Sequence, residues 1–177
     1  MPGIHREQTL LRRVYRRATL APAHVNGIDT LFMRVVITRV TEASVTVDGE
    51  PLASLPRPGL LVLAGIAHDD GTDEIRSVAA KIWSLRILDG ERSASDLGAP
   101  IMVISQFTLH AATRKGRRPS WSAAAPTSIS EPLVERFCAE LEGLGAEVLR
   151  GRFGADMQVA SANDGPVTIL IDTDDWS

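Results

Sequence analysis

The sequence predicts an α+β fold, with a curved, mostly antiparallel, barrel-like β-sheet and two main helices. Three observations predict it: strand patterns outnumber helical ones, most successive strands look antiparallel, and only two stretches have helical periodicity. With 177 residues, 44% of them hydrophobic and 23% charged, the chain is long enough for one domain with a single core. It contains no run of about 18 apolar residues, so no membrane-spanning segment is expected.

The first 32 residues differ in composition from the rest. Arg12, Arg13, Arg16 and Arg17 are bunched there, and a second methionine, Met33, precedes the first regular pattern. An arginine-rich, acid-poor leader is typical of a targeting peptide, whereas a start codon assigned upstream of Met33 or a disordered tail are plainer interpretations. We therefore expect 1–32 to be an N-terminal extension and 33–177 to form the functional domain.

Strand patterns begin directly after Met33. β-Branched residues are dense over 35–40 and alternate over 44–47, and the turn signal Asp48-Gly49 then predicts a hairpin. A continuous apolar run at 59–66 predicts a central strand that is buried on both faces. Further strands are expected at 101–109, 147–149, 156–161 and 167–172, with Asn163-Asp164-Gly165 as a turn between the last two.

Two stretches have the period of an amphipathic helix. The apolar residues of 72–85 lie on one stripe, and the acidic residues of the first turn suit the helix dipole. A second stripe runs through 131–144 and ends at Gly145. The single cysteine, Cys138, lies in this second stripe; it can form neither an internal disulfide nor a thiolate-rich metal site, so we interpret it as a packing residue.

Ordinary catalytic side chains do not gather in this sequence. The four histidines are scattered without metal-binding spacing, and no nucleotide-binding loop is present, so we expect neither a metal nor a cofactor. Ser105 and His110 are five residues apart, which disfavours a serine–histidine pair on one continuing strand. What remains are neutral polar groups on apolar strands, and taken alone such groups are usually structural: Ser105, Gln106, Thr108 and Thr168.

Two runs of residues carry a resemblance to a known family. Residues 105–109, Ser-Gln-Phe-Thr-Leu, and 163–168, Asn-Asp-Gly-Pro-Val-Thr, resemble the two signature motifs of bacterial and eukaryotic D-aminoacyl-tRNA deacylases. Supporting pieces occur in the family's order at 39–45, 115–120 and 153–157, and the resemblance extends from Met33 to about Thr173. In one departure, Ala111-Ala112-Thr113 stands where an aspartate is common before the threonine, which leaves the hydrogen bonding of that loop open.

The resemblance implies a cytoplasmic homodimer that hydrolyses the ester between a D-amino acid and tRNA, with active sites at the subunit interface. Glycine mischarged on alanine tRNA is a second expected substrate. The resemblance also implies that Gly165-Pro166 is a cis peptide that reaches into the partner's site, holds the α-amino group of the substrate and clashes with L side chains.

Residue roles follow from the same resemblance. Backbone N–H groups of Gln106 and Phe107 are expected to stabilise the oxyanion. Because no base is evident beside Thr168, we favour attack by water, assisted by the 2′-hydroxyl of the tRNA, with Thr168 shaping the pocket; a nucleophilic Thr168 is the alternative. The expected catalytic set is Ser105, Gln106, Phe107, Thr108 and Thr168; the expected substrate-binding set is Gly165, Pro166, Arg39 and Met157; and the expected tRNA contacts are Arg114, Lys115, Arg117 and Arg118.

Two other functions stay open at this point. One is a catalytically silent RNA-binding module, against which the intact motifs argue, and the other is a small-ester hydrolase, for which a nucleophile with its base is missing. The basic loop is interpreted equally well as a solvated surface. The formal net charge of −3 neither supports nor excludes RNA as a partner.

Overall fold

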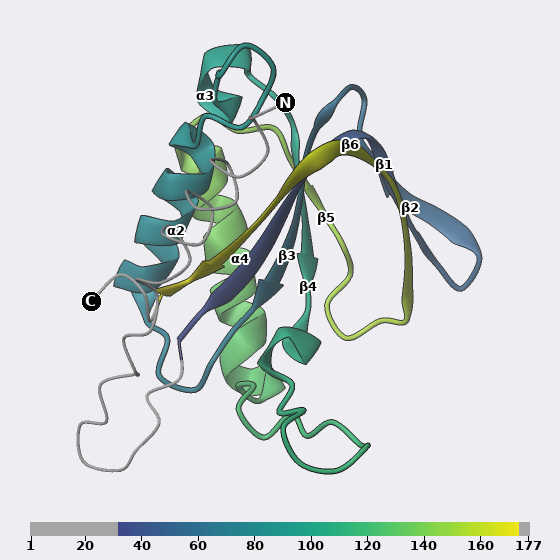
Figure 1. Cartoon of the computed structure of the whole chain (residues 1–177), viewed down its shortest axis with the longest axis vertical. Helices are drawn as coiled ribbons and strands as arrows, with labels where there is room; N and C mark the ends of the chain where they lie inside the picture. The colour runs from purple at the N-terminus through teal and green to yellow at the C-terminus, as the bar shows by residue number, and fades with distance from the viewer. Residues whose placement is uncertain (1–31, 174–177) are drawn as a thin grey trace, which may run out of the picture. The chain divides into compact units, whose positions relative to one another are not determined.

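The computed structural model describes residues 32–173, all of which belong to the compact unit Leu31–Ser177. The expected N-terminal extension, apart from Phe32, lies outside the described residues. None of the described helices is long and apolar enough to cross a membrane. The expected α+β architecture is confirmed, with a mixed sheet that is strongly curved and with helices packed on one of its faces (Figure 1).

The long strand β1, Arg34–Val47, organises the sheet. Its first half pairs antiparallel with β3, Gly59–Gly65, and its second half pairs antiparallel with β2, Glu50–Ser54. The predicted hairpin between β1 and β2 is confirmed, since Asp48 and Gly49 have φ values of 54° and 81°, the left-handed conformation that such a turn requires. On its other edge β1 pairs along nearly its whole length with β6, Met157–Asp172.

The prediction of two strands with a turn at Asn163-Asp164-Gly165 was wrong, because β6 is continuous. Thr38 pairs with Thr168 and Val40 pairs with Asn163, so β1 advances by 40 − 38 = 2 residues where β6 advances by 168 − 163 = 5. β6 thus has three extra residues here, and they bulge out of the ladder. Asn163, Asp164 and Gly165 therefore form a bulge rather than a turn, because β6 pairs with the same strand, β1, before and after them.

The centre of the sheet is parallel. β3 pairs with β4, Ile101–Ser105, and β4 pairs with β5, Val148–Arg150. The prediction that the strand continues to Leu109 was wrong: the backbone N–H of Gln106 makes a last ladder-like bond to the carbonyl of Ala64 (2.7 Å), and a 3₁₀ helix, η2 (Phe107–His110), follows.

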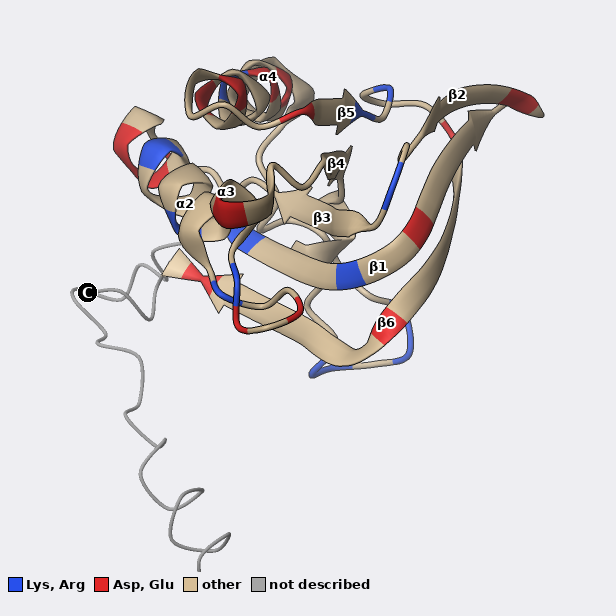
Figure 2. Cartoon of the chain, turned by 90° about the horizontal axis from the view of Figure 1, so that it is seen from above, with Lys and Arg blue, Asp and Glu red and all other residues tan. Residues whose placement is uncertain are grey.

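Two long helices cover one face of the sheet (Figure 2). Helix α2, Thr72–Ser84, agrees with its prediction, and α4, Thr127–Gly143, begins four residues before the predicted start at 131. The predicted start was late because the apolar stripe begins only at Leu133, whereas α4 already contains Pro132 and the five residues before it. A short helix, α3 (Ala94–Leu97), with Ser93 as its N-cap, was not predicted.

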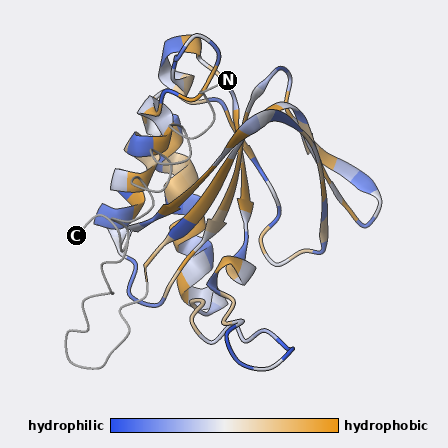
Figure 3. Cartoon of the chain, viewed as in Figure 1, coloured by the Kyte–Doolittle hydropathy of each residue, from blue (hydrophilic) through white to orange (hydrophobic). Residues whose placement is uncertain are grey.

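Two apolar clusters stabilise this arrangement, and Figure 3 shows the strands between them as the most hydrophobic part of the chain. The first lies between the sheet and α2 and α4, and it includes Val62, Ile82 and Phe137. The second lies within the curl of the sheet and includes Val45, Leu61 and Met102. Cys138 is buried in the first cluster, and this burial raises the pKa of its thiol to about 11, as the packing interpretation requires.

Candidate active site

The first signature motif begins where the central strand β4 ends. Ser105 is its last residue and pairs with Ala64 of β3; the chain then leaves the sheet at Gln106 and forms η2. The motif is therefore placed at the carboxyl end of buried parallel strands, where helices and loops leave room for a ligand.

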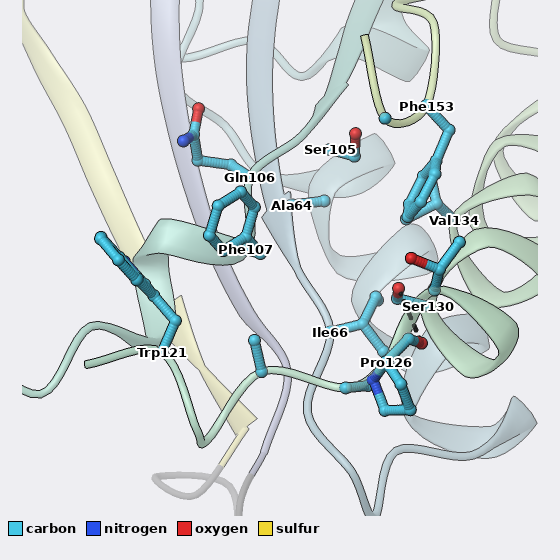
Figure 4. A pocket seen from close by; sticks show the side chains of 14 residues that line it. Ala64, Ile66, Ser105, Gln106, Phe107, Trp121, Pro126, Ser130, Val134 and Phe153 are labelled. Atoms are coloured by element: carbon cyan, nitrogen blue, oxygen red, sulfur yellow. Dashed lines mark hydrogen bonds between the residues drawn. The ribbon is translucent and has the colours of Figure 1, made fainter. Parts of the chain in front are cut away.

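A cavity of about 340 Å³ lies beside this strand end (Figure 4). Its walls come from β3, the motif, the loop before α4, α4 itself and the segment before β6. The Ser105 hydroxyl is one of few polar groups in a mostly apolar lining, as is common for a small-molecule site. The main lining residues are Ile66, Ser105, Phe107, Trp121, Val134 and Phe153.

Two aromatic rings stand at the mouth of this cavity. The rings of Phe107 and Trp121 meet edge to face, with their centroids 5.8 Å apart and an angle of 72° between their planes. They are 57% and 42% exposed, which is unusual for large apolar side chains. Such a pair offers an apolar surface to the planar groups of a ligand.

Of the two backbone donors expected at Gln106 and Phe107, one is already bonded within the sheet. The N–H of Gln106 is bonded to the carbonyl of Ala64, so it is not available to an oxyanion. The N–H of Phe107 has no acceptor within residues 32–173. The side-chain amide of Gln106 donates to the hydroxyl of Thr108, and in Figure 4 it points away from the Ser105 hydroxyl. An oxyanion donor therefore has to be sought at Phe107 and beyond it.

The second motif lies on edge strand β6. Its Gly165–Pro166 peptide bond is cis, and both residues are exposed in the bulge of three extra residues. Arg39 of β1 holds the start of this bulge: its Nε donates to the carbonyl of Asp164 at 3.1 Å and lies 2.9 Å from the carboxylate of the same residue. Asn163 adds a donor from its side-chain amide to the carbonyl of Arg39 at 3.0 Å.

Within one chain the two motifs lie in different depressions. Pro166 and Thr168 line an open groove together with Arg39 and the loop 86–91, whereas Ser105 and Phe107 line the cavity of Figure 4. Ser105 is separated from β6 by β3 and β1, which are three inter-strand steps of about 4.8 Å each, or roughly 14 Å along the sheet.

Thr168 is an exposed residue of β6 that pairs with Thr38. Among the described residues, no histidine or carboxylate is hydrogen-bonded to it. His110, the histidine nearest in sequence to the first motif, is buried at the end of η2, and burial lowers its pKa. Within residues 32–173, no base is therefore placed to activate either Ser105 or Thr168.

Met157, expected to bind substrate, is partly buried against the second apolar cluster and is not one of the residues that line the cavity. Its sulfur accepts a hydrogen bond from the N–H of Arg152 at 3.3 Å. Phe153, four residues earlier, does line the cavity. From the sequence, Phe153 was identified only as part of a supporting piece of the resemblance, and neither Trp121 nor Val134 was identified as a site residue.

The basic residues Arg114, Lys115, Arg117 and Arg118 lie on the exposed loop between η2 and α4, whose end is hydrophilic (Figure 3). Within residues 32–173 none of the four forms an ion pair. The loop is closed by paired backbone bonds between Ala112 and Ser120, of 2.7 and 3.2 Å, so the chain closes it without the aspartate common in the family.

Within residues 32–173, no group of three or more histidine, cysteine or carboxylate side chains is gathered to hold a metal.

Comparison with solved structures identifies the class of fold. The chain is similar to a structure described as c-Myc DNA Unwinding Element Binding Protein, with a TM-score of 0.73 and 37% identity over 78% of this chain and 97% of the other. A probable eukaryotic D-amino acid tRNA deacylase has the same fold, with a TM-score of 0.70 at 14% identity, over 80% of this chain and 100% of the other.

Comparison of sequences identifies the family. The model of the family described as D-Tyr-tRNA(Tyr) deacylase matches residues 36–172. A D-aminoacyl-tRNA deacylase of Cutibacterium acnes is 60% identical over 144 residues, which are 81% of this chain and 99% of that protein. A protein of the same name from Nocardia farcinica is 60% identical over 143 residues, 80% of this chain and 100% of that protein. The chain belongs to the D-Tyr-tRNA(Tyr) deacylase family.

Proposed function

We propose that this protein is a D-aminoacyl-tRNA deacylase, which hydrolyses the ester between a D-amino acid and the terminal adenosine of tRNA in the cytoplasm. The observation that carries the proposal is the intact first motif, Ser105 to Thr108, at the mouth of a ligand-sized cavity in a chain that is 60% identical to proteins of that name. The exposed pair Phe107 and Trp121 supports it, because a nucleoside has flat faces that pack well on aromatic rings.

The chemistry assigned to the cavity is acyl transfer to water. The tetrahedral intermediate carries a negative oxygen, and we assign the free N–H of Phe107 as a donor to it. Since no base in the described part of the chain adjoins Ser105 or Thr168, neither hydroxyl is activated there as the nucleophile of a covalent acyl-enzyme. We assign the attack to water, with the neighbouring 2′-hydroxyl of the tRNA assisting, and we assign to Thr168 the shaping of the pocket.

Selection of the D-enantiomer is assigned to the Gly165–Pro166 segment. We propose that its backbone oxygens hold the α-amino group and that it excludes a side chain in the L position. Backbone suits this role because it yields less than a flexible side chain, and each tenfold of discrimination needs about 1.4 kcal/mol. Arg39 supports the assignment, since it fixes the residue before this segment through both its carbonyl and its carboxylate. Glycine presents no side chain, so glycyl-tRNA mischarged on alanine tRNA is a second proposed substrate.

The distance between the two signature motifs within one chain supports a homodimer. A substrate in the cavity beside Ser105 is roughly 14 Å along the sheet from the strand that carries Pro166. A second copy of the chain can supply its own Gly165–Pro166 to that cavity, and a two-fold contact would build two such sites. Leu170, on the same edge strand, is 62% exposed and offers apolar surface for this contact.

One assay tests the proposal and separates it from its alternatives. Purified protein is incubated with D-tyrosyl-tRNA and L-tyrosyl-tRNA, and loss of each ester is followed over time. We expect hydrolysis of the D-ester and survival of the L-ester. Binding without loss of either ester would indicate a silent RNA-binding module, and equal loss of both, together with hydrolysis of small esters, would indicate an unselective esterase; each result would overturn the proposal.

A further inference from the structure

A buried carboxylate outside the active site ties two segments of the fold together. Asp70 is only 9% exposed, and both of its oxygens accept backbone hydrogen bonds. Oδ1 accepts from the N–H of Met33 at 2.7 Å, and Oδ2 accepts from the N–H of Ala67, also at 2.7 Å. Asp70 thereby fixes the nitrogen of residue 33 to the loop that follows β3.

Residue 33 is held from its other side as well. Its carbonyl accepts hydrogen bonds from the backbone N–H of Thr173 at 3.1 Å and from the hydroxyl of the same residue at 3.4 Å. The Met33 side chain is completely buried in the apolar cluster beneath α2 and α4. The nitrogen of Met33 therefore stays against Asp70 for as long as this corner of the fold is intact.

The charge of Asp70 lacks a positive partner. Burial is the main reason that its pKa rises to about 6, and the nearby carboxylates of Glu74 and Asp69 raise it further. Over residues 32–173 no lysine, arginine or histidine lies in an ion pair with Asp70. An amide N–H brings only a partial charge to a buried carboxylate, whereas an ammonium group at the same place would bring a full one.

The relatives indicate which ammonium group that is. The Cutibacterium acnes protein is matched over 99% of its own length by 144 residues of this chain, which leaves 177 − 144 = 33 residues without a counterpart. The family model matches residues 36–172, so 35 residues precede the family segment and only 177 − 172 = 5 follow it, which places most of the 33 extra residues at the N-terminal end. In such a relative the chain starts close to the position of Met33.

We infer that Asp70 is a binding site for a free α-amino group at residue 33, and that the functional form of this protein is a chain that begins at Met33. The α-ammonium replaces the amide N–H at Oδ1, supplies a positive charge and has donors left for further bonds. Residues 33–177 then contain the whole segment that the family model matches. This inference does not depend on the proposed activity.

The first test identifies the start of the chain. The gene is expressed without a tag and with its own upstream region, as wild type and as the variants Met1→Leu and Met33→Leu, and the intact masses of the products are measured. Leucine keeps the buried apolar side chain at 33 but removes a start codon. We expect the wild-type and Met1→Leu products to begin at Met33 and that product to vanish in Met33→Leu. A wild-type product that contains residues 1–32 and disappears in Met1→Leu would overturn the inference.

The second test addresses the charge pair itself. The chain 33–177, which has the length of its relatives, is compared with the same chain acetylated at its N-terminus, and Tm is measured between pH 4 and pH 8. In the acetylated chain the pKa of Asp70 lies above its ordinary value of 3.8, so the folded state binds its proton more tightly and stability falls as pH rises from about 4 to about 6.

In the free-amine chain the ammonium group lowers the pKa of Asp70, so its charge pair stabilises the fold at neutral pH and is lost as the carboxylate protonates. We therefore expect the two Tm values to converge near pH 4 and to separate, in favour of the free amine, as pH rises to 7. Equal Tm values across this range would overturn the assignment of Asp70, whatever the catalytic activity of either chain.

Discussion

Asn163 and Arg39 hold each other across the bulge of β6. Nδ2 of Asn163 donates to the carbonyl of Arg39 at 3.0 Å, and Nε of Arg39 donates to the carbonyl of Asp164 at 3.1 Å. The same Nδ2 also donates to the carbonyl of Val167 at 3.3 Å, which ties together the two residues that flank Asp164, Gly165 and Pro166. The sheet ladder is interrupted here, and these side chains replace it in fixing the position of the bulge.

Changing Asn163 to aspartate should therefore impair chiral selection. The substitution keeps the size of the side chain but turns a donor toward two carbonyl oxygens into an acceptor. We expect kcat/KM for D-tyrosyl-tRNA to fall about tenfold to hundredfold, as displacements of about 1 Å do in enzyme sites, and the ratio of D- to L-ester hydrolysis to shrink. Gln158→Glu makes the same exchange on an exposed residue of β6 and is the matched control. A folded Asn163→Asp protein with the wild-type ratio would contradict this role.

Mixed dimers should reveal whether one site draws on two chains. Ser105→Leu obstructs the cavity, and Pro166→Ala alters the segment assigned to the partner's cavity, so each variant alone should be slow. In randomly mixed dimers about half of the molecules contain one chain of each kind, and one of their two sites is intact, so about a quarter of the wild-type rate should return. The measurement is the rate on D-tyrosyl-tRNA after the variants are co-expressed. If each site lay within one chain, no rate would return.

Local chemistry accounts for the parts of the fold that the sequence predicted. The Asp48-Gly49 turn and the stripe of α2 depend on neighbours within a few residues, and both are present. The end of β4 was mispredicted because Phe107 and Leu109 continue an apolar pattern, whereas the chain turns at Gln106 after its last bond to β3. The turn residues of β6 were mispredicted because their conformation is decided by a partner strand more than a hundred residues away.

The candidate site likewise has residues that the sequence could identify and residues that only the folded structure brings together. Its motif residues were found through a resemblance, which identified Ser105, Arg39 and Pro166 as members of a site without giving their arrangement. The cavity walls Trp121 and Val134 come from segments that meet the motif only through packing, and no local pattern distinguishes them from ordinary core or surface residues. Packing also decides that the N–H of Gln106 is already occupied.

Replacing Thr168 with alanine should leave much of the deacylation rate. No base is bonded to its hydroxyl within residues 32–173, so the loss should affect the shape of the groove more than the bond-making step. We expect less than about a tenfold loss of kcat, whereas removal of a true covalent nucleophile costs on the order of 10⁴-fold or more. Single-turnover rates with D-tyrosyl-tRNA measure the effect, and circular dichroism checks the fold. Complete inactivity of a folded Thr168→Ala protein would restore the nucleophile hypothesis.

Neutralising the basic loop should reduce the salt dependence of the enzyme. Arg114, Lys115, Arg117 and Arg118 are exposed and form no ion pair within the described part of the chain, so they are available to the phosphates of an acceptor stem. With all four changed to glutamine, we expect a higher KM and a shallower fall of kcat/KM with added salt. The slope of log(kcat/KM) against log salt concentration should shrink by up to about one unit for each phosphate that is no longer neutralised. Arg76→Gln with Lys81→Gln on α2 is the control. An unchanged slope would leave the loop as a solvated surface.

Replacing glycine with alanine should have different effects on the free energy of unfolding at two positions, Gly59 and Gly143. A Cβ at Gly59, at the start of β3, would lie 2.2 Å from the carbonyl oxygen of Pro100, and this backbone contact cannot relax as a side chain would. Gly59→Ala should therefore destabilise the fold by about 2 kcal/mol or more. Gly143, the last residue of α4, has nothing within 4 Å of such a Cβ and no left-handed φ, so Gly143→Ala should be neutral or stabilising by up to about 1 kcal/mol. Urea unfolding of both variants measures the difference, and a Gly59→Ala protein as stable as Gly143→Ala would show that β3 and the Pro100 segment are less closely packed than this distance implies.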